Sequence, residues 1–319
     1  MTTDRSVDSD EFRQALAPLV GHTRGFANAV DAAGNRHGNT AMADSPATRE
    51  IADEARFVQA SVWTGAMSDT HTLGGMTLRA AADYLRTFAE AFAAERPPVY
   101  GHLVVARSAL ESSVVSWWLN EPGVARDERV KRGLSEILYS TVEVQRLGLH
   151  PEAQAAAEVD GWIEYATKLG WGVTDHNDRA WRHDSRGKPK VGGATRPSIR
   201  RALARLLVDN EDARIGSMEW SRLSAVSHVT WFGLEWALSA GDAVPSLTPG
   251  ISTVPFGTNS KQVALQALCV LRALRQAATA RATLMGWTDD QWQSDADDGA
   301  RYEAGMIEAF RRAGWPGES

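Results

Sequence analysis

Apolar residues recur along most of the chain at the three- and four-residue spacing of an amphipathic helix, and no stretch alternates convincingly as a strand would. This pattern, punctuated by proline and glycine, predicts an all-α protein, a multi-helix bundle of about ten helices. We expect one large helical domain over residues 1–319, or a subdivision into 1–170 and 198–319. The helices are expected at 10–33, 48–60, 77–95, 99–120, 124–147, 152–169, 198–209, 217–240, 259–285 and 288–313.

Two of these helices are apolar on nearly every face. The runs at 99–120 and 217–240 contain few charges, and a helix that is apolar all round is normally buried among others. The sequence therefore predicts a bundle built around two buried central helices. Elsewhere, the segment SDTHTLGGMT predicts a turn, after which Thr77 caps the next helix.

Residues 170–197 have no apolar period. The segment is rich in glycine, proline and charge, so we expect an exposed loop or lid, which is either functional or a plain surface loop. It also holds the strongest basic cluster of the chain, made of Arg179, Arg182, Arg186, Lys188, Lys190 and Arg196.

The expected helix at 217–240 carries a polar stripe. Ser221, Ser224, His228, Trp231 and Glu235 fall within about 80° on an ideal helix. We expect this helix to be mostly dehydrated, so its polar groups need partners. In the functional interpretation His228 acts as a general base or acid near neutral pH. Either Glu235 orients its imidazole, or the imidazole activates one of the serines. In the structural interpretation it bonds a serine hydroxyl or a carbonyl of a neighbouring helix.

The other central helix also carries ionisable groups, His102, Arg107 and Glu111. Arg107 and Glu111 have the spacing of a helical ion pair. Because a buried ion pair is costly without further bonds, we expect this pair to reach the serine and histidine face, either to build a site or to fix helix register. The candidate site, in a cleft partly covered by residues 170–197, consists of Arg107, Glu111, Arg222, Ser224, His228 and Glu235.

Composition excludes several classes of protein. No run approaches the about 20 apolar residues that span a bilayer. The net charge of −6 argues against coating nucleic acid through bulk electrostatics, although a local basic strip remains open. The N-terminal residues do not resemble a secretory signal and Cys269 is the only cysteine, so we expect a cytoplasmic protein. The 12 tryptophans supply rigid apolar area for a core or a pocket.

Two blocks of sequence, ARSALESSVVSWWLNEP with the following DERVKRGL, and WSRLSAVSHVTWFGL, resemble a widespread group of actinobacterial helical proteins that is similar to the HEPN superfamily. HEPN domains are helical bundles, often dimeric. Many are metal-independent ribonucleases with an Arg followed four to six residues later by His. Arg222 and His228 have this spacing, and the resemblance implies RNA or a nucleotide as partner, a homodimer, and no metal or cofactor. On an ideal helix these two residues lie about 120° apart, so their contact needs a kink or a partner subunit.

Two other classes of function remain open. Asp295, Asp297 and Asp298 spell DADD, which resembles the DxDD motif of class II terpene cyclases, and the tryptophans could line the cavity of an enzyme acting on an isoprenoid or another natural-product precursor. Aspartates near a helix start are also ordinary caps. The third class is a non-catalytic dimeric interaction protein whose polar stripe sets helix register. The sequence contains no phosphate-binding glycine fingerprint and no zinc-site histidine spacing.

Overall fold

The computed structural model describes residues 9–52, 65–94, 98, 100–147, 151–175, 177–182, 187–207, 210–228, 239–240, 244–245, 252–253, 256–257 and 260–312. These residues form ten helices and a few two-residue strands. The all-α class predicted from the apolar period is therefore confirmed. None of the described helices has both the length and the apolar character needed to cross a membrane.

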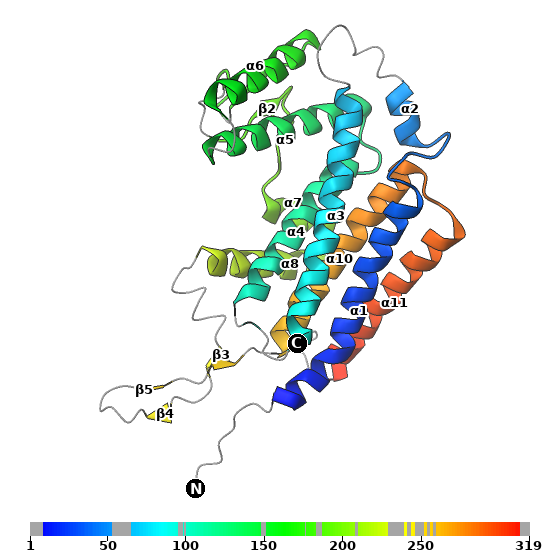
Figure 1. Ribbon diagram of the computed structural model, residues 1–319, viewed down its shortest axis with the longest axis vertical. Helices are drawn as coiled ribbons and strands as arrows, with labels where there is room; N and C mark the ends of the chain where they lie inside the picture. The colour runs from blue at the N-terminus through cyan, green and yellow to red at the C-terminus, as the bar shows by residue number, and fades with distance from the viewer. Residues whose placement is uncertain are drawn as a thin grey trace.

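Five long helices run side by side along the molecule (Figure 1): α1 (Ser9–Arg36), α3 (Ala66–Ala93), α4 (Gly101–Asn120), α10 (Ser260–Met285) and α11 (Asp290–Arg312). α4 packs against α3 and α10, while α1 covers α3 and, with α11, covers α10. The short α2 (Pro46–Ala52) packs against α3 and α10, and α7 (Ile199–Leu206) and α8 (Asn210–Ser227) pack against α4.

The nearly all-apolar run predicted at 99–120 forms α4 and lies at the centre of this bundle. Ala106, Leu110 and Val114 are completely buried in the main hydrophobic core. The same core contains residues of α10 such as Leu274. Helices from both sides of residues 170–197 thus share one core, and the prediction of a buried central helix is confirmed for α4.

A second, smaller core lies at one end of the bundle, where α5 (Arg126–Arg146) and α6 (Glu152–Lys168) meet β1 (Val173–Thr174) and β2 (Lys190–Val191). The two strands pair antiparallel, and Trp181 is buried in this core. The expectation that residues 170–197 form only an exposed loop is therefore wrong. Its few apolar residues are too widely spaced to give a period, although they are enough to anchor the segment.

The second apolar run differs more from its prediction. α8 begins at Asn210 rather than at 217, and the chain turns at His228. Leu223 is buried, but Ser221 and His228 are exposed, so the expected dehydration of this helix is wrong for its described part. Two strand pairs follow: β3 (Ser239–Ala240) with β6 (Phe256–Gly257), and β4 (Val244–Pro245) with β5 (Ser252–Thr253).

The turn predicted at SDTHTLGGMT is also wrong, because this segment lies inside α3. A Cβ atom on Gly74 would stand 2.8 Å from Nδ2 of Asn120 on α4. One on Gly75 would stand 3.0 Å from Nη2 of Arg281 on α10. The two glycines therefore serve close helix packing. Glycines that allow two helices to approach look, in sequence, the same as glycines that make a turn.

This packing predicts that Gly74→Ala destabilises the protein. The added methyl overlaps the buried Asn120 carboxamide, and overpacking of a close-packed interior costs about 1–3 kcal/mol. Chemical denaturation of the variant measures this loss. Gly21→Ala is the matched control, because nothing lies within 4 Å of its Cβ position, and alanine in a helix should leave stability unchanged or raise it by up to about 1 kcal/mol. Equal stability of the two variants would contradict the packing role.

Candidate functional site

Arg107 lies where α4 meets α8 and contacts three side chains. Its Nε donates to Oε1 of Glu111 over 3.0 Å, which confirms the ion pair expected from their spacing. Its guanidinium lies over the ring of Trp220 on α8, 4.9 Å from the centroid. Its Nη1 lies 3.5 Å from Nε2 of His228. The structure therefore brings Arg107, Glu111 and His228 together, as the two polar helix faces predicted.

His228 occupies the turn that ends α8. Its backbone N–H donates to the carbonyl of Ser224 over 3.0 Å, and its side chain is exposed to water. Arg107 by contrast is mostly buried, with 20% of its side chain exposed. The imidazole is thus open to an incoming molecule, while the guanidinium beside it is fixed by its neighbours.

The other predicted site residues are placed differently. Nη1 of Arg222 lies 2.7 Å from the carboxylate of Glu219, three residues earlier on α8. Ser224 is half-buried. Glu235 and Trp231 lie outside the described residues. The arginine that lies beside His228 therefore comes from α4, and no kink of α8 is needed for this contact.

Behind this junction, polar groups are sealed between α8 and α10. Glu219 is completely buried, and burial raises its pKa although Arg222 acts in the opposite direction. Burial, and next the nearby Glu219 carboxylate, raise the pKa of the Cys269 thiol. Gln266, one turn away on α10, is also completely buried. None of these three groups was singled out by the polar stripe, because nothing in a helical pattern distinguishes a polar residue in the core from one in solvent.

Basic residues of the segment 187–196 lie next to the junction. Nη1 of Arg196 lies 3.1 Å from Oε1 of Glu136, and both Arg196 and Lys188 lie over the ring of Tyr139 on α5. Burial and then the charge of Arg196 lower the pKa of Lys188, whereas Glu136 and Glu111 oppose that change. The influence of Glu111 places Lys188 near the Arg107 ion pair. Two residues of the predicted basic cluster, Lys188 and Arg196, therefore pack against α5 on the side of the Arg107 ion pair.

Comparisons with known proteins add no relative. No family model, curated protein or solved structure matches this chain. What the site can do therefore follows from its geometry.

An imidazole in water beside an immobilised guanidinium can perform two tasks on one substrate. The imidazole can accept or return a proton. The guanidinium, held by Glu111 and Trp220, can stabilise negative charge that develops on an oxygen atom. The pair matches the needs of an ester whose reaction passes through an anionic intermediate, and most directly of a phosphodiester.

His102, the third ionisable residue of α4, does not belong to this site. It is buried against Phe88 and Phe92, with its Nδ1 2.9 Å from the carbonyl of Pro98. Burial lowers its pKa to about 4. This histidine therefore fills the core in its neutral form.

A further buried network joins α2, α3 and α5 and has no counterpart in the sequence predictions. The Glu50 carboxylate lies 3.1 Å from Nε of Arg129 and 3.2 Å from Nε2 of His71. Burial disfavours its charge, yet these two partners lower the pKa of Glu50 below its ordinary value. Nη1 of Arg129 also donates to the carbonyl of Leu119 over 2.6 Å. These residues come from separate segments, so no local spacing reveals the network, whose bonds hold the helices together.

The aspartates of the DADD sequence lie on α11, and two of them form ion pairs. Asp295 pairs with Arg36 over 2.6 Å, and Asp298 pairs with Arg301 one turn away. The part of the chain that the structure describes holds no group of three or more His, Cys, Asp or Glu side chains arranged for a metal ion.

The burial of His102 predicts a pH dependence of stability. Its folded-state pKa of about 4 lies below the ordinary value of 6.5, so acid protonates the unfolded chain first. The His102 contribution is complete above pH 6.5 and is lost as the pH falls towards 4, by at most about 3 kcal/mol. Urea denaturation of the wild type and of His102→Phe across this range measures it. As the pH falls from 6.5 towards 4, the free energy of unfolding of the wild type should decrease relative to that of His102→Phe. A difference that stays constant with pH would contradict this account of the imidazole.

Proposed function

We propose that the protein cleaves RNA without a metal ion, at a site formed by His228 and Arg107 and flanked by Glu111. The observation that carries this proposal is the 3.5 Å approach of the Arg107 guanidinium to the exposed His228 imidazole. The resemblance to HEPN ribonucleases supports the same reaction. In this version of the site, however, the arginine is supplied by α4, and Arg222 serves as the partner of Glu219.

His228 acts on the proton of the ribose 2′-hydroxyl. When the imidazole is neutral, its unprotonated ring nitrogen accepts this proton and the 2′ oxygen attacks the adjacent phosphorus. The bond from phosphorus to the 5′ oxygen breaks, which leaves a 2′,3′-cyclic phosphate and a 5′-hydroxyl. Because His228 is exposed, the imidazolium returns its proton to solvent, and solvent protonates the departing oxygen.

Arg107 stabilises the phosphorane. Negative charge builds up on the non-bridging oxygens during the attack, and a guanidinium donates to two such oxygens at once. The bond to Glu111 and the stack on Trp220 fix its orientation before the substrate arrives. A donor that needs no reorganisation contributes most to stabilising the transition state.

The neighbouring surface suits a single RNA strand. Lys188 provides positive charge near Glu111, and Arg196 and the ring of Tyr139 lie beside Lys188. Stacking of bases on aromatic rings and contacts of phosphates with basic residues are the usual means of binding single strands. A local strip of this kind can attract RNA although the whole chain carries a net charge of −6.

A cytoplasmic location and a homodimer belong to the same proposal. The location rests on Cys269 being the only cysteine of the sequence, and the homodimer rests on the family resemblance. Light scattering of the purified protein tests the dimer independently of the activity.

The test is the cleavage of a fluorogenic single-stranded RNA oligonucleotide in excess EDTA. We expect wild-type protein to release a 2′,3′-cyclic phosphate end. We expect His228→Ala to lower kcat by about 10²- to 10⁴-fold through loss of the proton acceptor, and Arg107→Ala by about 10²- to 10³-fold through loss of one charge-stabilising donor. Added imidazole should restore part of the rate to the histidine variant and none to the arginine variant.

Two controls separate this chemistry from folding. His22→Ala and Arg301→Ala change the same residue types on α1 and α11 and should retain the wild-type rate. The Tm of each variant identifies any loss of structure. The proposal fails if wild-type protein leaves the RNA intact in EDTA, if a 2′-deoxy substrate is cleaved equally well, or if a folded His228→Ala variant keeps full activity.

A further inference from the structure

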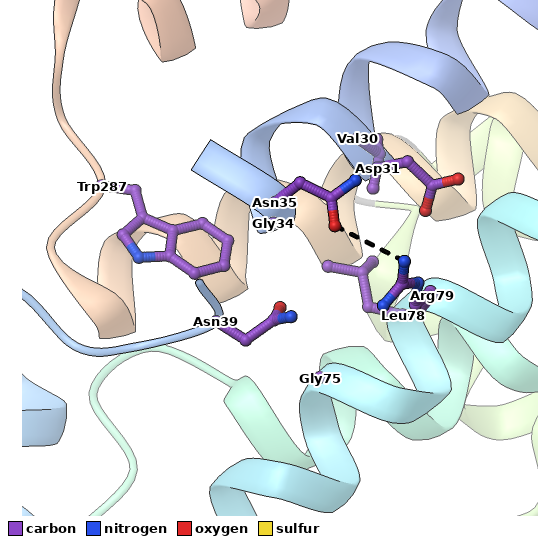
Figure 2. Close-up of a pocket in the computed structure, with 9 residues that line it drawn as sticks. All are labelled: Val30, Asp31, Gly34, Asn35, Asn39, Gly75, Leu78, Arg79 and Trp287. Carbon is purple, nitrogen blue, oxygen red and sulfur yellow. Dashed lines mark hydrogen bonds between the residues drawn. The ribbon is translucent and has the colours of Figure 1, made fainter. Parts of the chain in front are cut away.

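The pocket between α1 and α3 is too small to bind part of an RNA strand. Figure 2 shows the side chains of Asn35, Asn39 and Arg79 and the ring of Trp287 around it. Its volume of about 20 Å³ has room for roughly one water molecule. The nucleotides on either side of a scissile phosphate would therefore contact open side chains near Arg107.

Lys188 is held beside α5 by hydrogen bonds of the residues before and after it. The indole of the buried Trp181 donates to the carbonyl of Gly187 over 3.3 Å. The hydroxyl of Ser135 on α5 donates to the carbonyl of Pro189 over 2.9 Å. β2 begins at the next residue and pairs with β1. The fold of the smaller core therefore fixes the backbone that carries Lys188.

The ammonium group of Lys188 has no carboxylate within ion-pair distance among the described residues. It lies over the ring of Tyr139, 5.9 Å from the centroid, and the guanidinium of Arg196 lies over the same ring at 5.1 Å. Arg196 is paired with Glu136 over 3.1 Å, so its charge has a partner. Lys188 is half-buried, and burial and then Arg196 lower its pKa. A phosphate group beside the ammonium would favour its charged form.

Glu111 links Lys188 to the site of the proposed reaction. Its Oε1 accepts from Nε of Arg107 over 3.0 Å, and its charge also acts on Lys188. Because Glu111 is already paired with Arg107, its carboxylate does not leave a free negative charge that would repel a phosphate. Arg107 and Glu111 are separated by one turn of α4, about 6 Å along the axis, a distance that a single nucleotide spans.

We propose that Lys188 forms a second phosphate subsite of this protein, for the phosphate group that neighbours the scissile one. The inference rests on the proposed function, because the scissile phosphate is the one placed between His228 and Arg107. Lysine is suited to this task, since its ammonium binds phosphate as a point charge and needs no fixed orientation. The preferred substrate is therefore an oligonucleotide with two consecutive phosphates, rather than a dinucleotide with one.

Binding of ligands that cannot be cleaved tests the subsite separately from the chemistry. Three ligands contain 2′-deoxyuridine linked to adenosine, with no further phosphate, with a 5′-phosphate or with a 3′-phosphate. Isothermal titration calorimetry of the full chain gives the Kd of each. We expect one phosphorylated ligand to bind about 10- to 100-fold more tightly than the bare dinucleotide, the usual effect of a charge-assisted hydrogen bond. The tighter ligand identifies the side on which the subsite lies. Equal binding of all three, or no binding, overturns the inference.

Lys188→Gln should remove this advantage and leave the Kd of the bare dinucleotide unchanged, whereas Lys188→Arg should retain most of the advantage. Lys168→Gln changes an exposed lysine of α6 and is the matched control. The Tm of each variant reports on its fold. In the wild type, the advantage should also fall as sodium chloride is raised, which keeps the test valid if Lys188→Gln does not fold.

Two results overturn the assignment to Lys188: an advantage that persists in folded Lys188→Gln, or one that is independent of salt in the wild type. Failure of the proposed function is a different result. In that case the phosphorylated ligand binds through Lys188 as expected, but the protein leaves RNA intact in EDTA.

Discussion

The close approach of α3 to α4 and α10 at Gly74 and Gly75 is the constraint on which the rest of the bundle depends. The two glycines leave space for the side chains of Asn120 and Arg281, which bond to each other and to the backbone of α3. Buried polar groups of three helices therefore bond to one another at the point where these helices meet. Because a buried polar contact has strict geometry, it specifies how the helices are aligned as well as how far apart they lie.

The two guanidinium groups that matter most have opposite surroundings. Arg107 lies at the edge of the bundle, bound by a carboxylate and an indole on one side and adjacent to an exposed imidazole on the other. Arg281 lies inside the bundle, with no carboxylate in ion-pair distance among the described residues. The first arrangement presents a fixed positive charge to an incoming molecule. The second leaves a positive charge for which the described protein supplies no counter-ion.

The features that the sequence predicted well are those encoded within one helix. α4 was recognised because its apolar residues cover every face, and the bond from Arg107 to Glu111 because the two are one turn apart. The contact of Arg107 with His228 was expected only from the principle that buried charges need partners. In the structure the same guanidinium also lies over the Trp220 ring of α8, a contact that the sequence does not predict.

The features that the sequence did not predict depend on contacts between distant segments. The sequence pattern predicts a turn at Gly74 and Gly75, because only the neighbouring helices show that Asn120 and Arg281 fill the space of their missing side chains. The partnership of Glu50 with Arg129 joins residues far apart in the chain. A single sequence contains no signal for such pairs, because each residue alone is an ordinary charged residue of an amphipathic helix.

The sealed position of Cys269 gives the molecule a natural reporter of its own opening. It is the only thiol of the chain, it lies in the main core on α10, and burial beside Glu219 disfavours its ionisation. Alkylating reagents attack the thiolate, so the folded molecule should resist them. Labelling would occur only when α10 separates from its neighbours. The labelling rate of the wild-type protein would therefore measure how often the centre of the bundle opens.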